Sequence, residues 1–221
     1  ANKDTLLISE IFGDTSQWLQ GDRFDGTMNY SFRESMTDYF ATKRINNKEF
    51  SDSLAYLYSM YSFEALSSCQ NLLSSHDVKR FLNRCGNDKN GMLGAIFMQA
   101  TFPGIAGIYY GDEIGLGGAD DPFNREPFPW DDKKSWNLEI LDHLKNLMKI
   151  KREHSIFKYG RFELLNEHND FVAFRRILKD ESMLCIINRE KSNDDFQIIS
   201  NAHSINLKFG ECTANLDDGK I

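Results

Sequence analysis

The chain has 221 residues, of which 41% are hydrophobic, and a formal net charge of −7 at pH 7. This hydrophobic content is enough for a sizeable core, and an acidic balance without a basic block argues against a nucleic-acid partner. No apolar run has the length of a membrane-spanning helix, and the four cysteines lack CxxC spacing, so neither a membrane anchor nor a zinc or disulfide framework is indicated. We expect the thiols to be reduced in a cytoplasmic protein.

Short apolar strands alternate with helical patterns over residues 1–158. We expect strands at residues 5–8, 24–30, 69–77 and 105–110. We expect helices at residues 31–41, 49–61, 87–100 and 135–154. Ser31 and Glu34 have capping-box spacing, which predicts the start of the first helix. Consecutive strand–helix units of this kind form a parallel sheet, so the pattern predicts an α/β fold.

The pattern changes after Gly160. Short strand candidates joined by polar turns follow at residues 161–165, 171–178, 183–188, 196–199 and 204–209. A switch from alternating strands and helices to strands alone marks a domain boundary. We therefore expect one domain of residues 1–158 and a second of residues 159–221. The second is an all-β antiparallel, Greek-key-like sandwich that stops before an obvious end.

Polar residues follow each of the four predicted strands: Glu10, Asn29, the pair His76 and Asp77, and the pair Asp112 and Glu113. A parallel sheet presents these strand ends along one rim, where (β/α)8 barrels and doubly wound sheets both bind their ligands. The GxGxxG and P-loop patterns of nucleotide-binding proteins are absent from the sequence. Two carboxylates with a histidine between them fit the hydrolysis of glycosidic bonds. The simpler alternative is a His76–Asp77 hydrogen bond that locks a loop.

Five segments match one enzyme family: ISEIFGD (8–14), WLQGDRFDGTMNY (18–30), QNLLSSHDVKR (70–80), FPGIAGIYYGDEIGLGGADDPFNREPFPW (102–130) and DFVAFRR (170–176). In them the chain resembles the alpha-amylase family, glycoside hydrolase family thirteen, and within it the cyclomaltodextrinase, neopullulanase and maltogenic amylase branch. The long run at 102–130 is the most specific of the five. The resemblance implies a C-terminal fragment. Residues 1–158 would then be the second half of a catalytic (β/α)8 TIM barrel, strands 5–8.

The resemblance also implies roles for individual residues. Glu10 matches the general acid/base of the family, and Asp77 matches the third catalytic carboxylate, which stabilises the transition state. His76 matches the histidine that binds the sugar beside it. Arg125 matches a position that lines the sugar cleft, although a salt bridge within its loop is nearly as good an interpretation.

Other matched positions support the rim or differ from the family. Arg80 and Asp112 are expected to be supporting residues, with Asp112 anchoring its loop rather than touching substrate. Trp18 and Tyr110 either face sugar or pack in the core, and core packing is the favoured interpretation. Many members have Trp or His just after the acid, where Phe12 and Gly13 stand here, so subsite preference is open. No cofactor or metal is implied; calcium occurs in parts of the family, but the sequence has no dedicated calcium loop.

The implied function of the parent protein is retaining hydrolysis of α-glucosidic bonds in cyclomaltodextrin, pullulan or malto-oligosaccharides. The nucleophilic Asp of the family lies in a GxRxD pattern, and no such pattern precedes Glu10. We therefore expect the 221-residue chain alone to be inactive. We also expect it to associate through its open side, so that a homo-oligomer is one expected state. Two alternatives stay open: an oligo-1,6-glucosidase or transglycosylase of the same family, and a non-catalytic amylase-like binding module.

Overall fold

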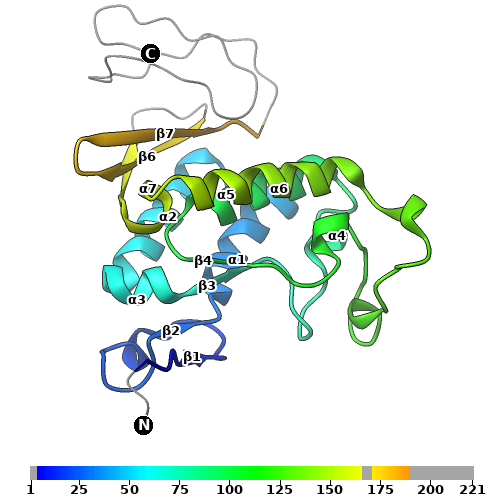
Figure 1. Ribbon diagram of the computed structural model, residues 1–221, viewed down its shortest axis with the longest axis horizontal. Helices are drawn as coiled ribbons and strands as arrows, with labels where there is room; N and C mark the ends of the chain where they lie inside the picture. Colours follow the sequence, from blue (N-terminus) through cyan, green and yellow to red (C-terminus); the bar gives the residue numbers. More distant parts are fainter. Residues whose placement is uncertain (1–3, 166–170, 190–221) are drawn as a thin grey trace, which may run out of the picture. The chain divides into compact units, whose positions relative to one another are not determined.

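The computed structural model describes residues 4–165 and 171–189 (Figure 1). Its first four strands are β1 (Ile8–Ser9), β2 (Gly26–Thr27), β3 (Gln70–Leu72) and β4 (Ile105–Gly107). The first two pair in parallel, and so do the last two. A parallel bridge from Met28 to Gln70 brings the end of β2 beside β3. The strands therefore follow one another in sequence order, and the predicted α/β fold is confirmed.

α-Helices follow β2, β3 and β4, as the sequence pattern predicts, whereas only a short 3₁₀ helix lies between β1 and β2. The α-helices are α1 (Tyr30–Met36), α2 (Asn47–Met60), α3 (Phe63–Ser68), α4 (Phe81–Arg84), α5 (Lys89–Thr101), α6 (Leu138–Glu153) and α7 (Ile156–Tyr159). A π-helical turn at Thr37–Ala41 continues α1, and short 3₁₀ helices lie at Ser16–Trp18, Asp112–Ile114, Phe123–Arg125 and Lys133–Ser135. None of the described helices is long and apolar enough to span a bilayer.

The start of α1 differs from the prediction. Asn29, not Ser31, is the N-cap, and its side chain accepts a hydrogen bond from the backbone N–H of Phe32 at 3.0 Å. Ser31 lies inside the helix, where its hydroxyl donates to the carbonyl of Gly13 at 3.2 Å. The predicted capping box is therefore wrong, because Asn29 already satisfies the orphan amide at the helix start. The strand consequently passes into its helix without a loop.

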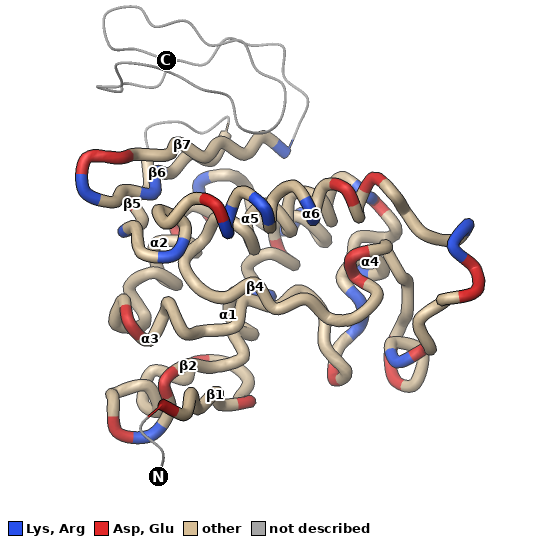
Figure 2. Tube along the Cα trace, in the orientation of Figure 1, with Lys and Arg blue, Asp and Glu red and all other residues tan. Residues whose placement is uncertain are grey.

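The abundant phenylalanines fill the space between the helices and the strands. Tyr39 of the π-helical turn stacks on Phe50 of α2, with ring centroids 4.0 Å apart. Phe32, Phe50 and Phe102 are fully buried. Aromatic rings of this size supply much of the apolar area that a core needs. Acidic and basic residues are interspersed along the described chain (Figure 2).

Three antiparallel strands follow the last helix: β5 (Arg161–Leu165), β6 (Val172–Leu178) and β7 (Glu181–Ile187). The fully buried Arg176 of β6 donates from Nη1 to the carbonyl of Thr101 at 2.6 Å and from Nη2 to that of Gly160 at 2.7 Å. These bonds join the sheet to the end of α5. The strands expected at 196–199 and 204–209 lie outside the described residues, and the domain boundary expected after residue 158 stays a prediction.

Candidate active site

Three side chains from two strand ends converge at the rim. Glu10 follows β1 directly, and His76 and Asp77 lie in the turn after β3. Nε2 of His76 is 3.9 Å from Oε1 of Glu10 and 3.3 Å from Oδ1 of Asp77. Their side chains are 48%, 49% and 36% exposed in chain order, so a ligand in solvent can reach all three. The structure therefore brings together the two carboxylates and the histidine that the sequence singles out.

Tyr30 and Ser75 lie beneath this group and were not predicted as site residues. The Tyr30 and Ser75 hydroxyls are hydrogen-bonded at 3.1 Å, and Ser75 Oγ also accepts from the backbone N–H of Asp77 at 3.1 Å. Burial raises the pKa of Tyr30, and the nearby charges of Asp77 and Glu10 raise it further. Tyr30 therefore stays a neutral phenol and supports the turn. The exposed ring of Phe12 stacks on Tyr30 at 4.0 Å, which places an aromatic face beside Glu10.

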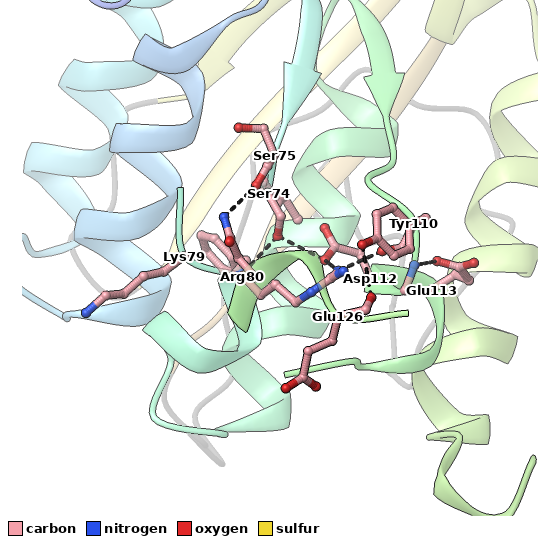
Figure 3. A network of polar contacts seen from close by, with 12 residues as sticks. Ser74, Ser75, Lys79, Arg80, Tyr110, Asp112, Glu113 and Glu126 are labelled. Atoms are coloured by element: carbon pink, nitrogen blue, oxygen red, sulfur yellow. Dashed lines mark hydrogen bonds and ion pairs between the residues drawn. The ribbon is translucent and has the colours of Figure 1, made fainter. Parts of the chain in front are cut away.

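Arg80 and Asp112 are buried below the turn and hold it in place (Figure 3). Ser74 Oγ donates to Oδ1 of Asp112 and accepts from the backbone N–H of Phe81, both at 2.9 Å. Nη1 of Arg80 donates to the carbonyl of Tyr110 at 2.6 Å and lies 3.5 Å from Oδ1 of Asp112. Because these groups are closed to solvent, they position the turn rather than contact a ligand.

The carboxyl of Asp112 has an unusual protonation equilibrium. Burial raises its pKa to about 7, while the hydrogen bond from Ser74 and the positive charge of Arg80 act in the opposite direction. Asp112 is 5% exposed, so the desolvation of its charged form outweighs both contacts. This carboxyl therefore changes charge near neutral pH.

Arg125 is not joined to the carboxylate group by any contact within the described part of the chain. It ends the 3₁₀ helix Phe123–Arg125, and its Nε lies 2.8 Å from Oδ1 of Asp121. Both side chains are largely exposed, at 47% and 64%. The loop salt bridge that the sequence offered as an alternative is thus present. A place for Arg125 in the sugar cleft stays a prediction.

Trp18 and Tyr110, the other two aromatic candidates, are both outside the core. Trp18 is half-buried, with the guanidinium of Arg23 4.8 Å from its ring centroid. Tyr110 is 39% exposed and donates from its hydroxyl to the carbonyl of Glu126 at 3.0 Å. Core packing, the favoured interpretation from the sequence, is therefore wrong for Tyr110, because this hydroxyl links the strand end to the following loop instead.

Glu10, His76 and Asp77 each offer one donor atom, and these atoms lie within 4.8 Å of one another. Calcium prefers six to eight oxygen ligands, and an imidazole nitrogen is not among them. The set therefore does not fit the calcium ion that occurs in parts of the resembled family. Two exposed carboxylates beside an imidazole suit hydrogen bonding to sugar hydroxyls and proton transfer.

Comparison with known proteins matches the chain to one family. Residues 1–159 match the family model described as alpha amylase, catalytic domain. Neopullulanase 2 from Thermoactinomyces vulgaris is 37% identical over 191 residues, which cover 85% of this chain and 32% of that protein. A cyclomaltodextrinase from Thermoanaerobacter pseudethanolicus is 34% identical, with 88% of this chain and 34% of the relative covered.

Solved structures agree with the sequence comparison. Cyclic alpha-maltosyl-(1→6)-maltose hydrolase from Arthrobacter globiformis, in complex with cyclic alpha-maltosyl-(1→6)-maltose, has a TM-score of 0.84 at 29% identity, over 90% of this chain and 44% of that chain. This chain spans about a third of the length of the curated relatives it matches. The resemblance to this family and branch is thereby confirmed. The chain belongs to the alpha-amylase family of glycoside hydrolases.

Proposed function

We propose that the protein containing this chain hydrolyses α-glucosidic bonds in starch-derived oligosaccharides with retention of configuration. The observation that carries the proposal is the convergence of Glu10 and Asp77 on His76, with Nε2 of the histidine 3.9 Å and 3.3 Å from the two carboxylates. A non-catalytic binding module would not need a solvent-accessible carboxyl pair held by a buried network. The buried Arg80–Asp112 pair beneath the turn gives the site the fixed geometry that catalysis needs.

Glu10 acts first as an acid and then as a base. It donates its proton to the glycosidic oxygen as the C1–O bond breaks, and it later removes a proton from the water that attacks C1. Asp77 and His76 hold hydroxyls of the reacting sugar and stabilise the positive charge that develops on its ring. The nucleophile that bonds to C1 between the two steps is a carboxylate from outside these 221 residues.

The proposal places residues 1–158 as strands 5–8 of a (β/α)8 barrel. The parallel order β1, β2, β3, β4 and the gathering of polar side chains at their carboxyl ends support it. The missing nucleophile would then come from the other half of the barrel. In retaining glycosidases the two reacting carboxyl groups are about 5–5.5 Å apart, so that half must close against β1.

The substrate class follows from the relatives and stays within α-glucans. The matched relatives are named neopullulanase and cyclomaltodextrinase, and one structural neighbour is a hydrolase of cyclic alpha-maltosyl-(1→6)-maltose. We propose cyclomaltodextrins, pullulan or short malto-oligosaccharides as substrates. The structural neighbour also supports a second candidate, in which the (1→6) bond is the preferred linkage.

The reaction class is tested on the full-length protein with cyclomaltodextrin and maltotriose. Anomeric proton signals recorded in the first minutes identify the configuration of the newly formed reducing end. We expect the α-anomer first, followed by slow mutarotation to the β-anomer. Initial release of the β-anomer would contradict the retaining mechanism, and binding without any product would favour the amylase-like binding module.

A further inference from the structure

Asn124 joins the loop after β4 to the turn that contains His76 and Asp77. It lies in the 3₁₀ helix Phe123–Arg125 and is 1% exposed. Its Nδ2 donates to the carbonyl of His76 at 2.9 Å and to that of Val78 at 3.1 Å, and lies 3.5 Å from the carbonyl of Ser75. One side-chain amide thus contacts three backbone carbonyls of a segment more than forty residues away.

The orientation of this amide is determined by its surroundings. All three facing groups are carbonyl oxygens, which only accept hydrogen bonds, so the NH₂ end must point toward them. Its Oδ1 is buried and has no hydrogen-bond partner among the described residues. A buried acceptor without a partner is unfavourable. The contribution of Asn124 therefore comes from its NH₂ group and the turn that this group holds.

Other contacts hold the ends of the turn, and within the turn Ser75 Oγ accepts from the backbone N–H of Asp77 at 3.1 Å. The Ser74 hydroxyl accepts from the backbone N–H of Phe81. The carbonyl of Gly118 accepts from the backbone N–H of Arg80 at 3.2 Å. Nε of Arg33 donates to the carbonyl of Leu73 at 2.8 Å. Asn124 instead contacts the backbone on both sides of Asp77. It is therefore placed to fix the direction in which the Asp77 and His76 side chains leave the backbone.

We propose that Asn124 is a positioning residue of the active site, which sets the orientation of His76 and Asp77 toward Glu10 through three backbone carbonyls. Its neighbour Arg125 lies in the same short helix, so the contacts of Asn124 also tie the Arg125 loop to the turn. The catalytic part of this inference rests on the proposed function. The structural part, that the amide holds the turn closed, does not.

Hydrogen exchange measured by mass spectrometry on the full-length protein tests the structural part. Asn124→Ala should speed exchange in the peptide spanning residues 74–81 by on the order of tenfold or more, because two or three carbonyl contacts are lost. The matched control is Asn46→Ala, which removes the N-cap of α2. It should speed exchange in residues 47–60 and leave 74–81 unchanged. Unchanged exchange in 74–81 of the Asn124 variant would overturn the proposal.

A second variant guards against a general folding defect. Asn124→Leu keeps the volume of the side chain and removes its hydrogen-bond donors. We expect the same faster exchange of residues 74–81 with wild-type exchange in α5. If the leucine variant exchanges like the wild type, Asn124 only fills space, and the proposal is wrong.

A double-mutant cycle with His76→Ala tests the catalytic part. Asn124→Ala should lower kcat/KM on cyclomaltodextrin by about 10- to 100-fold, with most of the loss in kcat, because misplacing a catalytic group weakens transition-state contacts. In a His76→Ala background the further loss should be several-fold smaller, because the two residues act as a unit. Equal losses in both backgrounds would contradict a positioning role.

The two tests separate failure of this inference from failure of the proposed function. If the Asn124 variants exchange faster in residues 74–81 but the wild-type protein is inactive, glucan hydrolysis is refuted and the role of Asn124 in holding the turn is supported. If the wild type is active and the Asn124 variants show unchanged exchange and turnover, only the proposed role of Asn124 is refuted.

Discussion

Exposure to solvent separates the rim residues into those that can touch a ligand and those that cannot. Glu10, His76 and Asp77 have open side chains, whereas Arg80 and Asp112 are 0% and 5% exposed. A buried ion pair of this kind gains little net stability from its charges, because desolvation offsets the attraction. Its contribution is directional, since it links Ser74 and Tyr110 to the turn that carries His76 and Asp77.

The raised pKa of Asp112 predicts a pH-dependent stability. The pKa of this carboxyl is about 7 in the folded protein, against an ordinary value of 3.8, so the folded state binds more protons than the unfolded chain between these values. The resulting stabilisation is fully present below the lower value and is lost as pH rises through 7. Between pH 5 and pH 8 the loss should be roughly 2–3 kcal/mol.

Asp112→Asn, which mimics the protonated form, isolates this contribution. Thermal unfolding of both full-length proteins at pH 5 and pH 8 gives the comparison. On going to pH 8, the melting temperature of the wild type should fall by more than that of the variant. Parallel pH profiles for the two proteins would show that Asp112 does not titrate in this range.

How much of the site could be predicted depended on the kind of contact each residue makes. Glu10, His76 and Asp77 lie at strand ends within recognisable motifs, so both their types and their common rim could be inferred. Tyr30 and Asn124 could not be inferred. Tyr30 acts through a hydroxyl on a serine 45 residues away. Asn124 binds backbone carbonyls, which every residue type has, so the sequence of the turn gives no sign of the contact. In its Gly-, Asp- and Pro-rich loop, Asn124 also looks like an ordinary turn residue.

At the scale of the elements, β2 and α3 approach unusually closely at Gly26. A Cβ atom at this position would lie 2.2 Å from the carbonyl oxygen of Ser68, at the end of α3. Neighbouring backbone atoms cannot move aside as a flexible side chain can. The glycine therefore allows β2 to pack beside the start of β3, which brings Asn29 and Gln70 together.

Gly26→Ala should destabilise the fold by about 1–3 kcal/mol or more, because the added methyl overpacks a backbone contact. Thermal unfolding of the full-length protein is the measurement. Gly117→Ala is the matched control, since a Cβ there would have nothing within 4 Å. If Gly26→Ala were as stable as Gly117→Ala, β2 and α3 would be able to move apart at little cost, and the prediction would be wrong.

Helices could be predicted where the apolar spacing extends over several turns, and were missed where it covers only a few residues. The sequence predicts α2, α5 and α6 to within a few residues because each has several turns of apolar spacing. It does not reveal α3, whose six residues FEALSS are too few to show a period. The second strand is shorter than predicted, because Asn29 already caps α1 where this strand was expected to end.

At the scale of the whole molecule, the outer strands leave apolar residues exposed. In the described part of the chain, β1 pairs only with β2, and β4 pairs only with β3. Leu6 and Leu7 before β1 are 54% and 48% exposed, and Ile105 of β4 is 43% exposed. Unpaired strand edges flanked by apolar side chains favour association with further strands.

The isolated 221-residue chain should therefore associate with itself. Light scattering over a range of concentrations should give a mass above the 25.5 kDa of one chain. Replacing Leu7 by Lys places a charge beside the open edge and should lower the associated fraction. A clean monomer at high concentration would contradict the prediction.

The isolated chain should also fail to hydrolyse glycosides. In the proposed mechanism Glu10 is the acid/base and Asp77 the stabilising carboxylate, but the sequence has no GxRxD pattern ahead of Glu10 to supply the nucleophile. Purified chain is assayed on maltotriose and cyclomaltodextrin beside the same chain with Glu10→Gln. Turnover above that of the variant would show that the chain contains a complete site.

The role of Glu10 as the acid/base is tested on the full-length protein with two leaving groups. Glu10→Gln should lower turnover of cyclomaltodextrin by about 10²–10⁴-fold, because the glycosidic oxygen must be protonated as it leaves. Glu34→Gln, at an exposed glutamate of α1, is the control and should leave turnover unchanged.

The same variant is then given α-maltosyl fluoride and azide. Fluoride leaves without a proton, and azide attacks the glycosyl-enzyme without a base. We predict that Glu10→Gln forms α-maltosyl azide from these reagents while it remains nearly inactive on cyclomaltodextrin. Near wild-type hydrolysis of cyclomaltodextrin by Glu10→Gln, or no azide product at all, would contradict the assignment of Glu10.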